Sequence, residues 1–340
     1  MSRLFPGLSG GLRGRIALLG GMLIACNALA WLWALLAFRH HPLLMGTALL
    51  AFSFGLRHAV DADHIAAIDN VTRKLMQEGR RPVTVGLYFS LGHSTIVVGL
   101  TLAVALVASV LHGRFEHWKV LGGVIGTGVS AFFLFAIAAA NLVILAGTWR
   151  SFRDARDGRL PEEAPFFTGG GLMARLFRGA FRLIEHPWQM YGLGLLFGLG
   201  FDTATQVGLL GVSASGSSKG LSPFAIMIFP ALFSAGMALI DTADSMLMLG
   251  AYGWAFVKPI RKLYYNLTIT SLSVLVAVLV GSIETLGLIA SYFKPAGAFW
   301  RLVGTVNGNF ATLGYGIIAL FVLGWLVSLL IYKIKRYEAV

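Results

Sequence analysis

Eight apolar stretches, each long enough to cross a bilayer as a helix, alternate with charged segments along this chain of 340 residues. A helix needs about 20 apolar residues to span the hydrocarbon core. Charged residues make up 12% of the chain, whereas soluble proteins carry about 25%. The sequence therefore predicts a single all-α, polytopic membrane domain over residues 1–340. The expected spans are roughly Ile16–Phe38, Leu43–His64, Val83–Leu111, Val120–Trp149, Trp188–Gly211, Phe229–Val257, Leu263–Tyr292 and Thr305–Tyr332.

The positive charges are distributed unevenly between the two sides of the membrane. Of the 27 lysines and arginines, 20 fall in the segments that share a side with both termini, six fall opposite, and Arg57 lies within the second span. Loops rich in lysine and arginine stay in the cytoplasm, so both termini are expected there. Because the net charge of +12 arises between apolar stretches, it predicts contact with anionic lipid and no nucleic-acid partner. The sequence does not indicate an oligomeric state.

The longest polar segment is the cytoplasmic loop over residues 150–187. Its second half alternates apolar residues with Arg175, Arg178 and Arg182, the pattern of an amphipathic helix that lies on the membrane surface. The alternative is a plain lead-in to the fifth span.

Two short motifs recur in order. Phe54-Gly55-Leu56 in the second span matches Phe197-Gly198-Leu199 in the fifth (197 − 54 = 143), and Phe89-Ser90-Leu91-Gly92 in the third matches Phe233-Ser234-Ala235-Gly236 in the sixth (233 − 89 = 144). Spans three apart run in opposite directions. The hypothesis is an inverted repeat relating spans 2–3 to spans 5–6, a common plan in transporters.

Ionisable residues at membrane depth are costly, and here they gather in the spans that carry the repeat. Glu284, near the outer end of the seventh span, is expected to reach the interface instead. The candidate metal ligands are His58, Asp61, Asp63, His64 and His93, and candidates for the transport path around them are Asp202, Gln206, Asp241 and Asp244.

Helical geometry limits how the second span can present its ligands. At 100° per residue, His58, Asp61 and His64 share one broad face, whereas Asp63 lies about 140° from His58. A straight helix cannot direct all four side chains at one ion. We expect either a broken helix, the favoured alternative, or an indirect role for Asp63.

The residue types narrow the choice of ion. Imidazole suits nickel, cobalt, zinc and copper(II), whereas magnesium and calcium sites use oxygen ligands. Since the only cysteine is Cys26, a thiolate site for copper(I) is not expected. Metal binding requires neutral histidines and is expected to weaken below a pH of about 6.5. Two alternatives remain open: His93 as an interhelical hydrogen-bonder, and Asp241 with Asp244 as a proton relay or helix-locking pair.

Four segments resemble the motifs of the nickel/cobalt transporter family, also called NiCoT permeases. They are Arg57-His58-Ala59-Val60-Asp61-Ala62-Asp63-His64-Ile65, Phe89-Ser90-Leu91-Gly92-His93-Ser94, Leu199-Gly200-Phe201-Asp202-Thr203-Ala204-Thr205 and Gly236-Met237-Ala238-Leu239-Ile240-Asp241-Thr242-Ala243-Asp244. Together with eight spans and a long middle loop, the resemblance covers essentially the whole chain. One departure is Gln206, where the family's third motif usually ends in glutamate.

The resemblance implies uptake of Ni²⁺, Co²⁺ or both across the bacterial inner membrane by one polypeptide without an ATPase. It also implies no prosthetic group and essential roles for the histidine–aspartate motif of the second span. The loss of a carboxylate at Gln206 puts a coupling role there in doubt. Three rival functions remain: a metal efflux protein of related architecture, a membrane-embedded metalloenzyme, and a proton-conducting channel.

Overall fold

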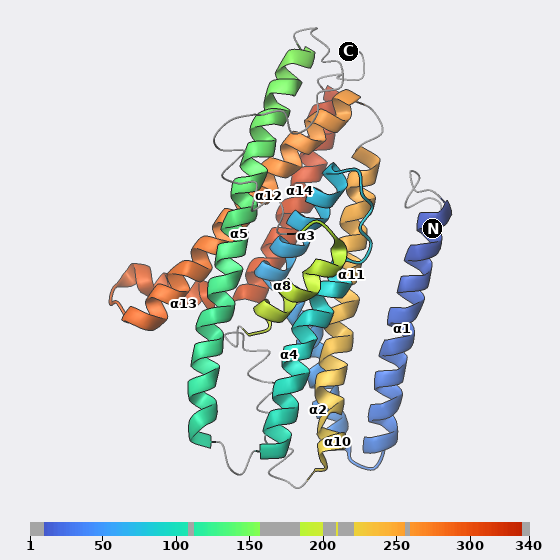
Figure 1. Ribbon diagram of the computed structural model, residues 1–340, viewed down its shortest axis with the longest axis vertical. Helices are drawn as coiled ribbons and strands as arrows, with labels where there is room; N and C mark the ends of the chain where they lie inside the picture. Colours follow the sequence, from blue (N-terminus) through green and yellow to red (C-terminus); the bar gives the residue numbers. More distant parts are fainter. Residues whose placement is uncertain are drawn as a thin grey trace.

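The architecture is a bundle of helices, seen in a computed structural model of the chain (Figure 1). The structure describes residues 10–107, 112–156, 184–199, 209, 221–255 and 259–334, and all regular secondary structure in these ranges is helical. The helices are α1 (Gly10–Phe38), α2 (Pro42–His58), α3 (Ala62–Gln77), α4 (Val85–Val107), α5 (His112–Arg156), η1 (Pro187–Gln189), α8 (Met190–Phe197), α10 (Pro223–Ile226), α11 (Ile228–Ala255), α12 (Pro259–Phe293), α13 (Ala298–Asn307) and α14 (Phe310–Ile334).

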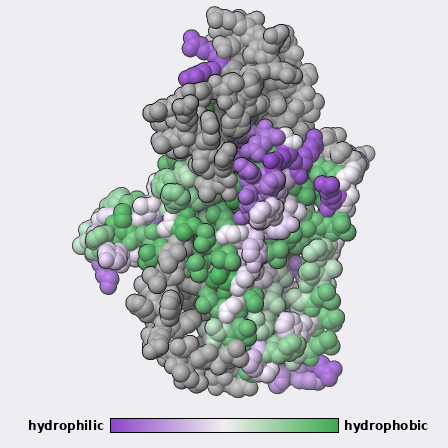
Figure 2. Space-filling model, viewed as in Figure 1, coloured by the Kyte–Doolittle hydropathy of each residue, from purple (hydrophilic) through white to green (hydrophobic). Residues whose placement is uncertain are grey.

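Within these ranges, five helices are long and apolar enough to cross a membrane: α1, α4, α5, α11 and α12. Two bent pairs, α2 with α3 and α13 with α14, raise the number to seven if each pair counts as one span. Hydrophobic residues cover much of the described surface, and hydrophilic residues gather towards its two ends (Figure 2). The all-α polytopic prediction is confirmed, although not the number eight. Of the fifth expected span the structure describes α8, and both Asp202 and Gln206 lie outside the described residues.

The second expected span is longer than its hydrophobicity indicated. It was expected to end at His64, but α3 continues to Gln77. Arg73 and Lys74, two of the 20 basic residues counted outside the expected spans, do not lie in a loop, because both are buried in α3. The guanidinium of Arg73 donates to Thr270 Oγ1 at 3.0 Å, and Lys74 Nζ donates to a backbone carbonyl at 2.7 Å. These polar side chains can be buried because groups outside α3 accept their hydrogen bonds.

A polar network joins α3 to α5 and α12. Asn70 Oδ1 accepts from Arg73 at 3.0 Å and from Asn141 at 2.7 Å, while Ser273 Oγ donates to Asp69 at 2.7 Å. All five side chains are at most 1% exposed. Hydrogen bonds between buried side chains fix how α3 sits between its neighbours.

A second pair of polar residues joins α5 to α12. Glu284 is 3% exposed and accepts a hydrogen bond from Ser130 at 2.8 Å. The expectation that Glu284 reaches the membrane interface is therefore wrong, because a partner on α5 satisfies the carboxylate inside the bundle.

Helix α1 lies at one edge of the bundle and α5 and α12 lie towards the other (Figure 1). Asn27 of α1 donates to the carbonyl of Ala235 in α11 at 3.2 Å, which attaches α1 to the bundle. The helix α5 runs past its expected end to Arg156, and the amphipathic helix expected in the middle loop lies largely within residues 157–183, outside the described ranges. The candidate metal ligands that the structure describes belong to α2, α3, α4 and the break between α2 and α3, and α11 packs against them.

Candidate metal centre

The second span is broken inside the histidine–aspartate motif. Helix α2 ends at His58, α3 begins at Ala62, and the two axes differ in direction by 50°. Asp61, the residue before α3, has an extended backbone (φ −63°, ψ 146°). A Cβ at Gly314 of α14 would overlap the carbonyl oxygen of Val60, so glycine allows α14 to pack directly on the break. The favoured expectation of a broken helix is confirmed.

The break brings three histidines together. His58 closes α2, His64 lies in the first turn of α3 and His93 comes from α4. Their exposed fractions are 2%, 0% and 2%, and one ring nitrogen from each lies within 4.8 Å of the others. His58 Nε2 and His93 Nε2 are 3.0 Å apart. A buried cluster of imidazoles in the membrane part of the chain is a candidate site for a transition metal.

Two buried carboxylates orient two of the rings through contacts with their Nδ1 atoms. Asp61 Oδ2 lies 2.9 Å from His58 Nδ1, and both Asp241 oxygens lie 3.3 Å from His64 Nδ1. A carboxylate accepts a proton at Nδ1 and thereby leaves Nε2 with its lone pair, the arrangement typical of metal-binding histidines. Ser90 Oγ donates to Asp241 at 2.5 Å and fixes the second carboxylate in turn.

The ring nitrogens of His58 and His93, which form an interhelical hydrogen bond in this structure, are at a separation that one ion can bridge. Two imidazole nitrogens at about 2.0–2.1 Å from a metal stand roughly 3 Å apart when their bonds meet at a right angle, as His58 and His93 do here. His64 Nε2 is buried without a hydrogen-bond partner in the described part of the chain. An uncompensated buried acceptor is costly, and a bound cation would satisfy it.

The other predicted residues take different positions. Asp63 Oδ1 accepts from the backbone N–H of His64 at 2.9 Å, and its side chain is only partly buried. Asp244 lies one turn beyond Asp241 on α11, with its Oδ2 buried and unbonded among the described residues. The cluster of ligand atoms that the structure brings together consists of the three histidines, without Asp61, Asp63 or Asp244.

Aromatic rings enclose the histidines on two sides. Phe89 meets His64 edge to face at 4.8 Å between ring centroids, and Phe233 lies 5.6 Å from His58. Both phenylalanines are fully buried. The sequence had indicated Phe89, Ser90 and Phe233 only as parts of the repeat and, for the first two, of a family motif, since neither the ring contacts nor the bond to Asp241 shows in the spacing.

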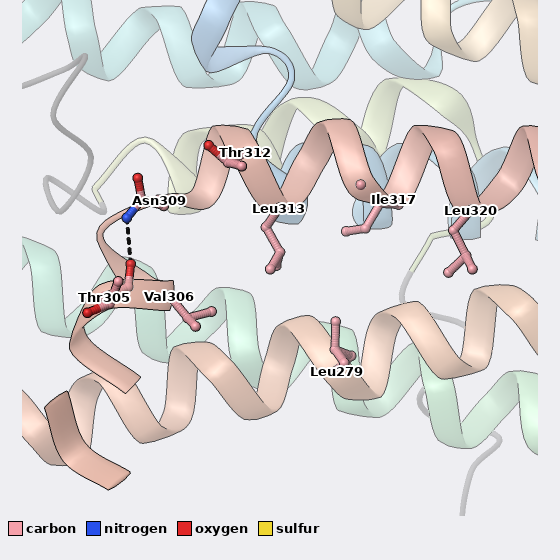
Figure 3. A pocket seen from close by; sticks show the side chains of 9 residues that line it. Leu279, Thr305, Val306, Asn309, Thr312, Leu313, Ile317 and Leu320 are labelled. Carbon is pink, nitrogen blue, oxygen red and sulfur yellow. Dashed lines mark hydrogen bonds between the residues drawn. The ribbon is translucent and has the colours of Figure 1, made fainter. Parts of the chain in front are cut away.

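A separate groove of about 490 Å³ lies between α12, α13 and α14. Figure 3 shows Leu279, Leu313, Ile317 and Leu320 along its apolar part, and Asn309 bonded to the Thr305 carbonyl where α13 turns into α14. No histidine or carboxylate lines the groove. Its lining offers no ligand set for a metal, so the chemistry belongs to the histidine cluster.

The chain is similar over most of its length to known nickel and cobalt transport proteins. Residues 44–331 match the model of the NicO family, described as high-affinity nickel-transport protein. A high-affinity nickel transport protein of Cupriavidus necator is 57% identical over 329 residues, which cover 96% of this chain and 94% of the relative. The nickel transporter NicT of Mycobacterium tuberculosis is 42% identical (95% and 90% covered), and the cobalt transport protein NhlF of Rhodococcus rhodochrous is 41% identical (86% and 84% covered). No solved structure matches.

Proposed function

Because the chain belongs to the NicO family of high-affinity nickel-transport proteins, we propose that it takes up Ni²⁺, Co²⁺ or both across the bacterial inner membrane. The observation that carries the proposal is the buried triad of His58, His64 and His93 at a break in a membrane-spanning helix. Imidazole ligands suit these ions, and discontinuous helices commonly build the sites of transporters.

The electrostatics of the triad suit a doubly charged cation. Asp61 and Asp241 contact two of the histidines and offset part of the cost of removing the ion from water. In our proposal both termini are cytoplasmic, so the ion enters from the side of the α2 N-terminus and leaves past α3. The negative-inside potential favours the entry of two charges by about 4.6 kcal/mol per 100 mV, which supplies a driving force without a cotransported ion.

The rival functions make different demands. An efflux protein could use the same ligands in the opposite direction, and the names of the relatives as transport proteins favour uptake only by analogy. A di-iron enzyme needs further ligand clusters, and the triad is the only such group within the described ranges. We therefore propose a transporter with Ni²⁺ or Co²⁺ as its substrate, no prosthetic group and no enzymatic role.

The test is uptake of radiolabelled nickel and cobalt into right-side-out and inside-out vesicles. Wild type is compared with His58→Ala, with Asp63→Ala and with His40→Ala, whose histidine is exposed and serves as the control. We expect both ions or one of them to accumulate in right-side-out vesicles, and His58→Ala to abolish this uptake. Wild-type uptake by His58→Ala would refute the site, and accumulation only in inside-out vesicles would establish efflux.

The domain organisation also remains a proposal. We propose one transporter domain over residues 1–340, with the loop over residues 150–187 in the cytoplasm and its second half on the membrane surface. The alternation of apolar residues with arginines supports the surface helix.

A further inference from the structure

Two helix pairs pack through the same pair of contacts. A Cβ at Gly55 of α2 would overlap the carbonyl of Phe233 in α11, and a Cβ at Gly194 of α8 would overlap the carbonyl of Phe89 in α4. Phe89 and Phe233 are the repeat positions in the third and sixth spans. The pair α2·α11 therefore corresponds to the pair α8·α4.

These contacts define which residue of α2 corresponds to which residue of α8, and the result differs from the alignment of the two Phe-Gly-Leu motifs. Gly55 corresponds to Gly194 (194 − 55 = 139) and Gly92 to Gly236 (236 − 92 = 144). The sequence match had placed Gly55 opposite Gly198 and is wrong by four residues, or one helical turn. A slip of one turn keeps the same helix face towards the neighbour, and for this reason the motif alone could not reveal it.

The ends of α2 and α8 agree with the corrected register, because α2 ends at His58 and α8 at Phe197 (197 − 58 = 139). The N–H of Ala59 bonds to the Gly55 carbonyl at 3.2 Å, and the N–H of Gly198 bonds to the Gly194 carbonyl at 2.8 Å. The residues after the two helices, Ala59 and Gly198, have φ −61° in both cases and ψ −18° and −16°. Phe197 thus occupies the position of His58, and its ring lies 5.2 Å from Phe89 as His58 lies 5.6 Å from Phe233.

The two pairs are not packed equally tightly at their second glycine. A Cβ at Gly92 would overlap the carbonyl of Tyr191, whereas a Cβ at Gly236 would lie 3.0 Å from the carbonyl of Phe52. Helices α4 and α8 are therefore closed at this point, and α2 and α11 are further apart at the corresponding point. An inverted repeat whose halves differ in this way can exchange the two arrangements and so expose its site to opposite sides in turn.

We propose that the transport cycle exchanges the packing of these two helix pairs. In the second state, α2 and α11 close at Gly236 and Phe52, while α4 and α8 separate at Gly92 and Tyr191. His58 and His93 lie on α2 and α4, and their counterparts in the other half are Phe197 and Met237. The ion thus stays with α2 and α4 while α8 and α11 move. This inference rests on the proposed transport function.

Two substitutions distinguish the states. Gly92→Ala is incompatible with the packing of α4 and α8 in this structure and should shift the population towards the second state. Gly236→Ala meets a tight contact that the present state can accommodate by a small shift, but it should block the second state. Gly99→Ala, on the same helix as Gly92 and with open space around it, is the matched control.

The readout is the distance between spin labels in lipid nanodiscs, in a Cys26→Ser background. One label pair, Leu49→Cys with Phe224→Cys, reports α2 against the α10–α11 end. A second pair in the other half, Trp188→Cys with Arg81→Cys, reports α8 against the segment that leads into α4. All four positions are exposed. We expect Gly92→Ala to shorten the first distance and lengthen the second, Gly236→Ala to hold both at their metal-free values, and Gly99→Ala to behave like wild type.

Distances that move together in Gly92→Ala, or that do not differ between Gly92→Ala and Gly236→Ala, would overturn the exchange. Loss of the monodisperse gel-filtration peak identifies a variant that has failed to fold, and Gly92→Ser then repeats the test at the same contact. The measurement needs no transported metal. Opposite shifts without nickel or cobalt uptake would therefore refute the proposed function and leave the exchange intact.

Discussion

His58 and His93 face each other through their Nε2 atoms, 3.0 Å apart, although α2 and α4 place them 35 positions apart in the chain. The Asp61 carboxylate at His58 Nδ1 determines which nitrogen faces inward. Because one ion would need both rings as ligands, removal of either histidine should abolish most of the affinity of the site for the metal.

The first prediction concerns the carboxylate behind His64. Asp241→Asn retains the size of the side chain but removes the charge that holds the Nδ1 proton. We expect nickel affinity to fall by about 10–100-fold, the usual effect of losing such a partner, as measured by calorimetric titration of purified protein. Asp63→Asn, which alters a carboxylate bonded to backbone, should have a smaller effect, and an equal loss in both variants would contradict this role for Asp241.

Ser90 provides a milder test of the same arrangement. Ser90→Ala removes the hydroxyl that donates to Asp241 at 2.5 Å and leaves the carboxylate in place. The affinity should fall by less than in Asp241→Asn, because the charged carboxylate beside His64 Nδ1 is retained and loses only one of its hydrogen bonds. Combining the two substitutions should cost little more than Asp241→Asn alone, and additive losses would show that Ser90 acts elsewhere.

The helix break depends on the contact between α14 and Val60. Gly314→Ala places a methyl group against the Val60 carbonyl. Overpacking of this kind should lower the free energy of unfolding by about 1–3 kcal/mol. Gly316→Ala, two residues away with open space around it, is the control. Thermal unfolding in detergent should show a lower Tm for Gly314→Ala only, and equal Tm values would argue against the close packing.

The buried arginine of α3 should matter for stability. Arg73→Ala removes the hydrogen bonds to Thr270 and Asn70, and about 1.5–3 kcal/mol is expected for each bond to the charged group before the neighbours relax. Arg81→Ala, at an exposed position, should leave the Tm within about one degree because surface substitutions have little effect. If the two variants unfold alike, Arg73 lies in the loop that its sequence position had suggested.

The fold class and the identity of the key residues were accessible from the sequence because both follow from local rules. Long apolar stretches predict membrane helices, and histidines with aspartates at membrane depth indicate a site, whatever the helices do around them. A break near His58 was the favoured one of two alternatives, since 100° per residue cannot direct the whole motif at one point. The structure shows the break but leaves Asp63 outside the cluster of ligand atoms.

The sequence by itself determined the class of protein and identified the histidine–aspartate motif and His93 as candidate ligands. Only the tertiary structure decided the grouping of His58, His64 and His93, the placement of Asp241 behind His64 and the burial of Arg73. It also decided the register of the repeat at Gly55. These features depend on contacts between helices that are distant in the chain, and periodicity within one helix carries no information about which turn of a neighbour it meets.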